Sequence, residues 1–131
     1  MIRTFNPPGV APPAPGYRHG AAAGADLRWL YVAGQVGAAP DGTIVQGFGP
    51  QLEQCFHNIF AVLEADGMSH TDIVKLVIYV TPNGPDVVAE YREIRNRMMQ
   101  GHEPPATYLG VTSLAHPDFL VEVEAIAAAP V

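Results

Sequence analysis

The sequence is poor in cysteine and in basic residues. It holds one cysteine, Cys55, among 131 residues, so no disulfide bond can form within the chain. Seven Lys and Arg stand against thirteen Asp and Glu, which gives a net charge of −6 and no basic cluster for a phosphate backbone. Neither a signal peptide nor a long apolar span is present. These absences predict a cytoplasmic protein with no nucleic acid and no membrane as partner.

The sequence also lacks the patterns of a metal or cofactor site. No two histidines have the His-x-x-x-His spacing that would put both on one face of a helix. The glycine-rich segments at 34–37 and 47–50 do not have the pattern of a phosphate-binding loop. Cys55 falls on the apolar side of a predicted helix, which favours packing over nucleophilic chemistry. We expect neither a metal nor a cofactor.

The residues that are present predict one globular domain over 1–131, since 48% are hydrophobic and 15% charged. Repeated prolines between residues 5 and 16 remove backbone donors, so residues 1–16 are expected to form an extended arm on the surface. Residues 17–25 and 27–36 are rich enough in β-branched and aromatic side chains to predict two strands. A tight turn around residues 24–26 would pair these strands antiparallel.

Apolar residues at three- and four-residue steps predict a helix over 50–67 and a second one that begins after Pro85 and ends near Gly101. In the second helix, Arg92, Glu93, Arg95 and Arg97 are expected to point outward. Residues 72–80 predict a central strand covered on both faces. Further strands are expected over 107–114 and 119–127. The order of elements predicts an α+β sandwich, with two helices on one face of a mixed sheet.

Two carboxylates lie in the last of these strands. Because side chains alternate, Val121 and Val123 belong to one face, whereas Glu122 and Glu124 share the other with Leu120 and Ile126. Two helices cover only one face, so the second face must meet water or another subunit. A partly buried carboxylate can act as a general base. The alternative is a structural hydrogen bond to backbone or arginine across an interface, which is favoured for Glu124 and equally weighted for Glu122.

Four segments resemble, in order and spacing, the YjgF/RidA family of reactive intermediate deaminases, also called endoribonuclease L-PSP. They are YVAGQVG (31–37), DIVKLVIYVT (72–81), PPAT (104–107) and FLVEVEAIA (119–127). The resemblance implies a homotrimer of chorismate-mutase-like α+β subunits whose sheets form a central barrel. It also implies clefts for a small molecule between subunits, and the neighbouring subunits would cover the second face of the sheet.

The resemblance further implies roles for single residues. Members similar to RidA hydrolyse enamines or imines, and the glutamate that positions the water falls on Glu122. The cleft tyrosine falls on Tyr17, the close backbone approach on Gly34, and a backbone carbonyl near the reacting carbon on Leu109. The arginine that binds the substrate carboxylate does not carry over, because this sequence has Thr107 at that position.

Further residues are candidates for holding a substrate. Strand alternation puts His19 on the same side as Tyr17, although a structural hydrogen bond is the simpler expectation for it. Of Tyr108 and Leu109, one should face inward and the other toward the cleft or interface, and the sequence does not distinguish them. Ala33 stands where the family has a serine.

Two functions follow from these residues. The first is hydrolysis, by deamination, of a small imine, enamine or related metabolite. Glu122 would handle the water, while Thr107, Tyr108 or His19 would bind the substrate. Without the arginine, a typical 2-aminoacrylate deaminase is not expected. The second is a non-catalytic trimer that binds a metabolite or has a regulatory role. The acidic composition gives no support to a ribonuclease.

Overall fold

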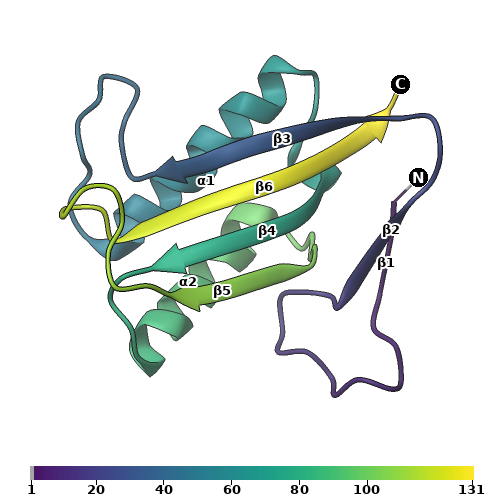
Figure 1. The fold of residues 1–131 in the computed structure, drawn as a ribbon, viewed down its shortest axis with the longest axis horizontal. Helices are drawn as coiled ribbons and strands as arrows, with labels where there is room; N and C mark the ends of the chain where they lie inside the picture. Colours follow the sequence, from purple (N-terminus) through teal and green to yellow (C-terminus); the bar gives the residue numbers. More distant parts are fainter. Residues whose placement is uncertain (1) are drawn as a thin grey trace.

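In the computed structural model, which describes residues 2–131, a four-stranded sheet is covered on one face by two helices (Figure 1). Its strand order is β3-β6-β4-β5, with β6 antiparallel to β3 and β4 and with β5 parallel to β4. The strands are β3 (Leu27–Val36), β4 (Ile73–Val80), β5 (Ala106–Gly110) and β6 (Val121–Pro130), and the helices are α1 (Phe48–Ala65) and α2 (Pro85–Met99). This is the predicted α+β sandwich on a mixed sheet.

Helix α1 forms because its apolar residues recur on one face. Leu52, Cys55, Phe56, Ile59 and Leu63 are all fully buried against the sheet. The helix ends before Gly67, whose φ of +69° lies in the left-handed region that favours glycine. The predicted span of 50–67 differs from the observed one by two residues at each end.

Helix α2 begins with Pro85 at its first turn and ends where Gln100 adopts a left-handed conformation. Tyr91 and Ile94 are buried, as the apolar spacing predicts. Met99 is buried as well, whereas Met98, which the spacing places on the apolar face, is half-buried. A short 3-10 helix, η1 (His70–Asp72), leads into β4. Strand β4 is buried on the side of the helices and only half-buried on the other side, so a single chain covers one of its faces rather than the predicted two.

One buried amide fixes how β6 enters the sheet. Gln51 of α1 is 1% exposed, and its Nε2 donates to the carbonyls of Val45 at 2.9 Å and Asp118 at 2.8 Å. Its Oε1 accepts a hydrogen bond from the backbone nitrogen of Leu120 at 2.9 Å. A buried amide satisfied in this way resists displacement. Gln51 therefore holds Leu120, the residue just before β6, and so helps to set the register of Glu122.

The predicted pairing of residues 17–25 with 27–36 is wrong. The strand in this region, β2 (Gly20–Ala23), pairs instead with β1 (Ile2–Phe5) in a separate two-stranded sheet. Figure 1 shows this hairpin beside the main sheet rather than within it. The residues expected as an extended N-terminal arm thus begin with a strand, and the proline-rich stretch forms the connection between β1 and β2.

Glycine explains why β2 pairs with β1. Phe5 lies opposite Gly20 in the register, and a Cβ added to Gly20 would lie 2.6 Å from the Phe5 ring. The ring therefore occupies the space that a side chain would need, an arrangement typical of aromatic residues beside glycine in a sheet. The other residues of β2 are alanines, which carry little strand preference of their own.

The prediction that Arg95 points outward from the second helix is also wrong. Arg95 is buried, with 3% of its surface exposed. Its Nη2 donates to the carbonyl of Pro15 at 2.9 Å. The next backbone nitrogen, that of Gly16, donates to Glu103 Oε2 at 2.9 Å. These contacts press the proline-rich segment against α2 and bury the guanidinium, which helical periodicity alone does not predict.

The observed bounds of β5 and β6 also differ from the predicted ones. The strand predicted over 107–114 stops at Gly110, and the strand predicted over 119–127 runs from Val121 to Pro130. Residues 111–120 form a loop whose end is held by Gln51. The alternation predicted for β6 is confirmed, because Val121, Val123 and Ala125 are buried while Glu122 and Glu124 are half-exposed.

Replacing Arg95 should release the proline-rich segment. Arg95→Met keeps the apolar stem and removes the charged donor to Pro15, so we expect a cost of about 1.5–3 kcal/mol. Hydrogen exchange should rise in residues 6–19 and remain unchanged in β4 and β6. Arg92→Met, an exposed change on the same helix, is the control. Unchanged protection of residues 6–19 in Arg95→Met would contradict this role.

Candidate functional site

The face of the main sheet that the helices leave free, here called the outer face, carries a mixture of polar and apolar side chains. Strand alternation assigns them, and their exposure agrees. Trp29, Tyr31 and Leu109 are 47%, 72% and 42% exposed. The outer face consists of Trp29 and Tyr31 of β3, Lys75, Val77 and Tyr79 of β4, Thr107 and Leu109 of β5, and Glu122, Glu124 and Ile126 of β6.

The registers arrange this face in rows across the strands. One row is Glu122–Tyr79–Leu109 and the next is Glu124–Val77–Thr107. Adjacent rows are about 7 Å apart, since each is two residues further along every strand. The two glutamates are thus neighbours on one strand, yet each has different neighbours across the sheet.

Glu124 has a partner within the chain. The Tyr79 hydroxyl donates a short hydrogen bond to Glu124 Oε1. This hydrogen bond is the largest cause of the raised pKa of Tyr79, because it stabilises the protonated phenol beside a carboxylate. The structural interpretation of Glu124 therefore has a physical basis in this contact.

Glu122 is placed differently, against the backbone of Gly34. A Cβ added at Gly34 would lie 1.9 Å from Glu122 Oε2, so a larger residue at this position would displace the carboxylate from where it lies. The register of β3 shifts between Val32 and Gln35, and this irregularity brings Gly34 over the glutamate. Among the hydrogen bonds and ion pairs of residues 2–131, none engages the Glu122 carboxylate. Its oxygens are free to accept a hydrogen bond from water.

Cys55 lies beneath this site on the buried side of the sheet. Burial, and next the charge of Glu122, raise the pKa of the thiol to about 12. A thiol with this pKa is protonated at neutral pH and is a poor nucleophile. The structure thus agrees with a packing role for Cys55.

Thr107 lies next to a cation that the sequence interpretation did not single out. Lys75 Nζ donates to Thr107 Oγ1 at 3.0 Å. Lys75 is the third residue of β4, whose other residues are all apolar apart from Tyr79. A charged residue at an alternating position of such a strand is the sequence signal that could have identified it.

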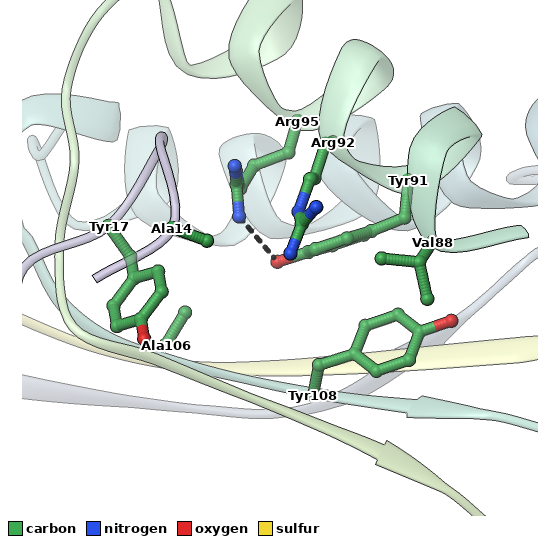
Figure 2. Close-up of a pocket in the computed structure, with 8 residues that line it drawn as sticks. All are labelled: Ala14, Tyr17, Val88, Tyr91, Arg92, Arg95, Ala106 and Tyr108. Carbon is green, nitrogen blue, oxygen red and sulfur yellow. Dashed lines mark hydrogen bonds between the residues drawn. The ribbon is translucent and has the colours of Figure 1, made fainter. Parts of the chain in front are cut away.

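Tyr17 and Tyr108 both line a pocket on the other side of β5, next to α2 (Figure 2). The pocket has a volume of about 230 Å³ and is lined by Ala14, Tyr17, Val88, Tyr91, Arg92, Arg95, Ala106 and Tyr108. The ring centroids of Tyr108 and Tyr91 are 5.0 Å apart. The Tyr108 hydroxyl is buried without a hydrogen-bond partner among residues 2–131, and burial raises the pKa of this phenol.

The structure therefore divides the predicted site residues into two groups. Tyr17 and Tyr108 line the pocket beside α2. Gly34, Thr107, Leu109 and Glu122 belong to the outer face. Of Tyr108 and Leu109, Leu109 is the one that points to the outer face. The side chain of Tyr108 packs on α2.

His19 contacts Tyr17 but does not line the pocket beside α2. Its Nε2 makes a hydrogen bond of 2.8 Å with the carbonyl oxygen of Ala11, and its ring lies edge-on to Tyr17 with centroids 5.7 Å apart. The two rings touch each other, but they line different hollows. The hydrogen bond is of the structural kind considered for His19.

Two further observations bear on the chemistry of the described chain. Within residues 2–131, no group of three or more His, Cys, Asp and Glu side chains is arranged to hold a metal ion. No helix in the same range is long and apolar enough to cross a membrane.

The chain is similar in sequence to several known proteins. A RutC family protein from Pyrococcus horikoshii is 35% identical over 106 residues, which cover 76% of this chain and 78% of that protein. The RutC family protein YjgH of Escherichia coli is 34% identical over 72% of both chains. A RutC family protein of Aquifex aeolicus is 43% identical, but the match spans 54 residues and 43% of its length.

Solved structures share the fold. YyfB of Yersinia pestis, described as a protein of unknown function of the conserved Rid family, matches with a TM-score of 0.90 and 31% identity over 98% of both chains. RidA from the Antarctic bacterium Psychrobacter matches with a TM-score of 0.70 and 31% identity over 89% of this chain and 92% of that one. Residues 9–129 match the family model described as Endoribonuclease L-PSP. The chain therefore belongs to the Endoribonuclease L-PSP family, the YjgF/RidA family that its sequence motifs resemble.

Proposed function

We propose that this protein hydrolyses a small imine or enamine to ammonia and a keto product, in clefts between the subunits of a homotrimer. One observation carries this proposal, namely the Glu122 carboxylate, which lies against Gly34 with no partner among the other described side chains. A carboxylate with free oxygens on a half-exposed face is suited to bind and deprotonate a water molecule.

The proposed reaction needs one side chain that accepts and donates protons, and this side chain is Glu122. Water adds to the carbon of the C=N bond while Glu122 accepts a proton from the water and passes it to the nitrogen. The product is a carbinolamine, which has hydroxyl and amino groups on the same carbon. Glu122 then accepts the proton of the hydroxyl group and delivers it to the amino nitrogen, the C–N bond breaks, ammonia leaves, and the carbonyl forms. Gly34 contributes space beside the carboxylate, and the backbone of Leu109 is proposed to lie near the reacting carbon.

The outer face supports the proposed trimer. Trp29, Tyr31, Leu109 and Ile126 give it an apolar surface beside its charged groups, and exposed apolar patches of this kind mark interfaces. Neighbouring subunits that cover this face would turn its polar groups into the walls of clefts. The localisation in the cytoplasm and the lack of a nucleic acid partner remain predictions.

Thr107 limits the proposed substrates. A threonine hydroxyl has no charge and cannot grip a carboxylate with two parallel hydrogen bonds as an arginine does. We therefore do not expect a typical 2-aminoacrylate deaminase. The same feature favours the second candidate, a non-catalytic trimer that binds a metabolite or has a regulatory role. Release of ammonia from a panel of imino acids and enamines separates the two.

The first prediction from this proposal is the assembly itself. Light scattering of the wild-type protein at micromolar concentration should give three times the chain mass, because a lone subunit would leave its apolar outer face in water. Tyr31→Glu, which places a charge at the most exposed aromatic residue of that face, should shift the protein toward the monomer. A wild-type protein that stays monomeric at this concentration would refute the trimer.

A second prediction separates the two glutamates. Glu122→Gln keeps the shape and removes the basicity, so ammonia release should fall by roughly 10²-fold or more while the melting temperature stays near the wild-type value. Glu124→Ala removes the acceptor of the Tyr79 hydroxyl, at a cost of roughly 1–3 kcal/mol, and should lower the melting temperature and weaken the trimer. Tyr79→Phe is the matched control, since it removes the same hydrogen bond from the other side. If Glu122→Gln dissociates the trimer and Glu124→Ala does not, the roles are reversed.

A third prediction concerns the uncharged anchor. Wild-type turnover of 2-aminoacrylate should be slow, and Thr107→Arg should raise it by roughly tenfold to a hundredfold, since a hydrogen bond to a charged group contributes about 1.5–3 kcal/mol. Thr107→Gln, of similar reach but without charge, is the control. Efficient turnover by the wild-type protein would show that its carboxylate contact does not depend on an arginine at this position.

A further inference from the structure

The pocket beside α2 contains a buried cation that pairs with no carboxylate. Arg95 lines this pocket and is 3% exposed, yet none of the ion pairs formed by residues 2–131 includes it. Its guanidinium donates only to neutral oxygens, namely the carbonyl of Pro15, the amide of Asn96 and the hydroxyl of Tyr91. A buried charge costs free energy unless an opposite charge neutralises it. Arg95 therefore attracts an anion strongly.

A second guanidinium faces the same pocket. Arg92 lines it as well, and neither an ion pair nor a hydrogen bond within the described chain engages the Arg92 side chain. Figure 2 shows the two arginines on one side of the pocket. Burial raises the pKa of the Tyr91 phenol, while the charges of Arg95 and Arg92 act in the opposite direction, so both cations lie near that hydroxyl. An anion between them would meet two positive charges.

The rest of the wall offers hydrogen-bond donors and apolar surface. The chain has thirteen Asp and Glu residues, but the wall of this pocket consists of two arginines, three tyrosines and three apolar residues. The Tyr108 hydroxyl is buried without a partner among residues 2–131. The Tyr91 hydroxyl accepts a hydrogen bond from Arg95, and within the same range it donates none. Phenols and guanidiniums donate hydrogen bonds, and the tyrosine rings form flat apolar walls.

We propose that this pocket binds a small phosphomonoester, with the phosphate between Arg92 and Arg95 and the carbon body against the tyrosine rings. A phosphomonoester carries a charge of about −1.5 to −2 at neutral pH, so it balances two guanidiniums where a carboxylate would balance one. The planar fork of an arginine also matches the oxygens of a phosphate.

The size of the pocket limits the carbon body. Its volume is about 230 Å³, whereas sites for drug-sized ligands span roughly 300–1,000 Å³. A phosphate with one ring or a short carbon chain is therefore the class of ligand that fits. A nucleotide or another larger phosphate is excluded by this volume.

This site is separate from the proposed site of hydrolysis. Tyr108 and Leu109 are adjacent in β5 and point to opposite faces, so the sheet lies between the pocket and the outer face that carries Glu122. The phosphomonoester would be a second ligand and not the imine. The proposal does not depend on whether the protein hydrolyses anything.

The first experiment measures binding to the wild-type protein by calorimetry, in a buffer free of phosphate and sulfate. Phenyl phosphate is the probe, because it joins a dianion to one aromatic ring. Methyl phenyl phosphate has the same ring and one charge less, so its Kd should be roughly tenfold higher. Inorganic phosphate, without the ring, should bind several-fold more weakly than phenyl phosphate. Absence of phenyl phosphate binding, or equally tight binding of benzoate, would overturn the proposal.

The second experiment removes one of the two cations. Arg92→Met should raise the Kd of phenyl phosphate by roughly tenfold to a hundredfold and leave the melting temperature of the free protein near the wild-type value, since this side chain is exposed. Arg97→Met removes a cation from the same helix outside the pocket and is the matched control. Equal Kd values for Arg92→Met and the wild-type protein would show that the phosphate binds elsewhere.

The third measurement locates the ligand. Ala14 and Tyr17 belong to the wall of the pocket, so a bound phosphate would connect the proline-rich segment to α2. Hydrogen exchange in residues 14–19 and 88–95 should slow when phenyl phosphate is added, while exchange in β3 should not change. Slower exchange in β3 alone would place the anion on the outer face and contradict the assignment.

A structural explanation competes with the proposal, since a carboxylate of a neighbouring copy could pair with Arg92 and Arg95. In that case the pocket would be occupied in the assembled protein, phenyl phosphate would not bind, and Arg92→Met would change the mass measured by light scattering. Binding with an unchanged mass supports the phosphate site.

Discussion

The constraint on which this structure depends is that two helices cover one face of a four-stranded sheet and leave the other uncovered. The covered face is built from residues such as Leu76, Ile78 and Val123, which are fully buried. Strand alternation then sends every second residue of β4, β5 and β6 to the uncovered face. Polar residues in these strands are therefore kept out of the core, and they gather on one surface without any loop to carry them.

The same alternation gives two chemically identical side chains different properties. Glu122 and Glu124 are two residues apart on one strand, but the strands beside them present different partners. Glu124 accepts a hydrogen bond from Tyr79, whereas Glu122 lies against a glycine that offers space and no donor side chain. A carboxylate with a phenol partner is committed to that contact, and a carboxylate beside a bare backbone remains available to water. Difference in environment, rather than in residue type, is the basis for assigning the two roles.

The sequence predicts the parts of the fold that have strong periodicity. The helices and the alternation of β6 follow from apolar spacing, because each buries an apolar face. The strand at 27–36 follows from its β-branched and aromatic content. The family motifs add Glu122 and Gly34, and the structure brings these two into contact.

The features that the sequence does not predict depend on contacts between residues far apart in the chain. The short strand Gly20–Ala23 carries almost no side-chain information, and its partner, Ile2–Phe5, lies beyond a proline-rich connection. Arg95 has the spacing of an exposed residue, but its guanidinium lies against the proline-rich segment and donates a hydrogen bond to the carbonyl of Pro15. Lys75 was hidden within an apolar strand whose pattern predicted cover on both faces. The direction of the Lys75 side chain depends on which face of the sheet the helices cover.

The charges on the outer face argue against a dry interface there. Glu122, Glu124 and Lys75 share that face, and transfer of such groups from water into an apolar contact costs free energy unless each is paired. Neighbouring subunits could bury Trp29 and Tyr31 with a gain, while the charged rows would favour spaces that stay hydrated. An assembly formed through this face is therefore expected to seal along its aromatic residues and to leave water-filled clefts beside Glu122. The proposed hydrolysis requires water next to the carboxylate, so the polarity that prevents complete burial of the face would also provide the reactant.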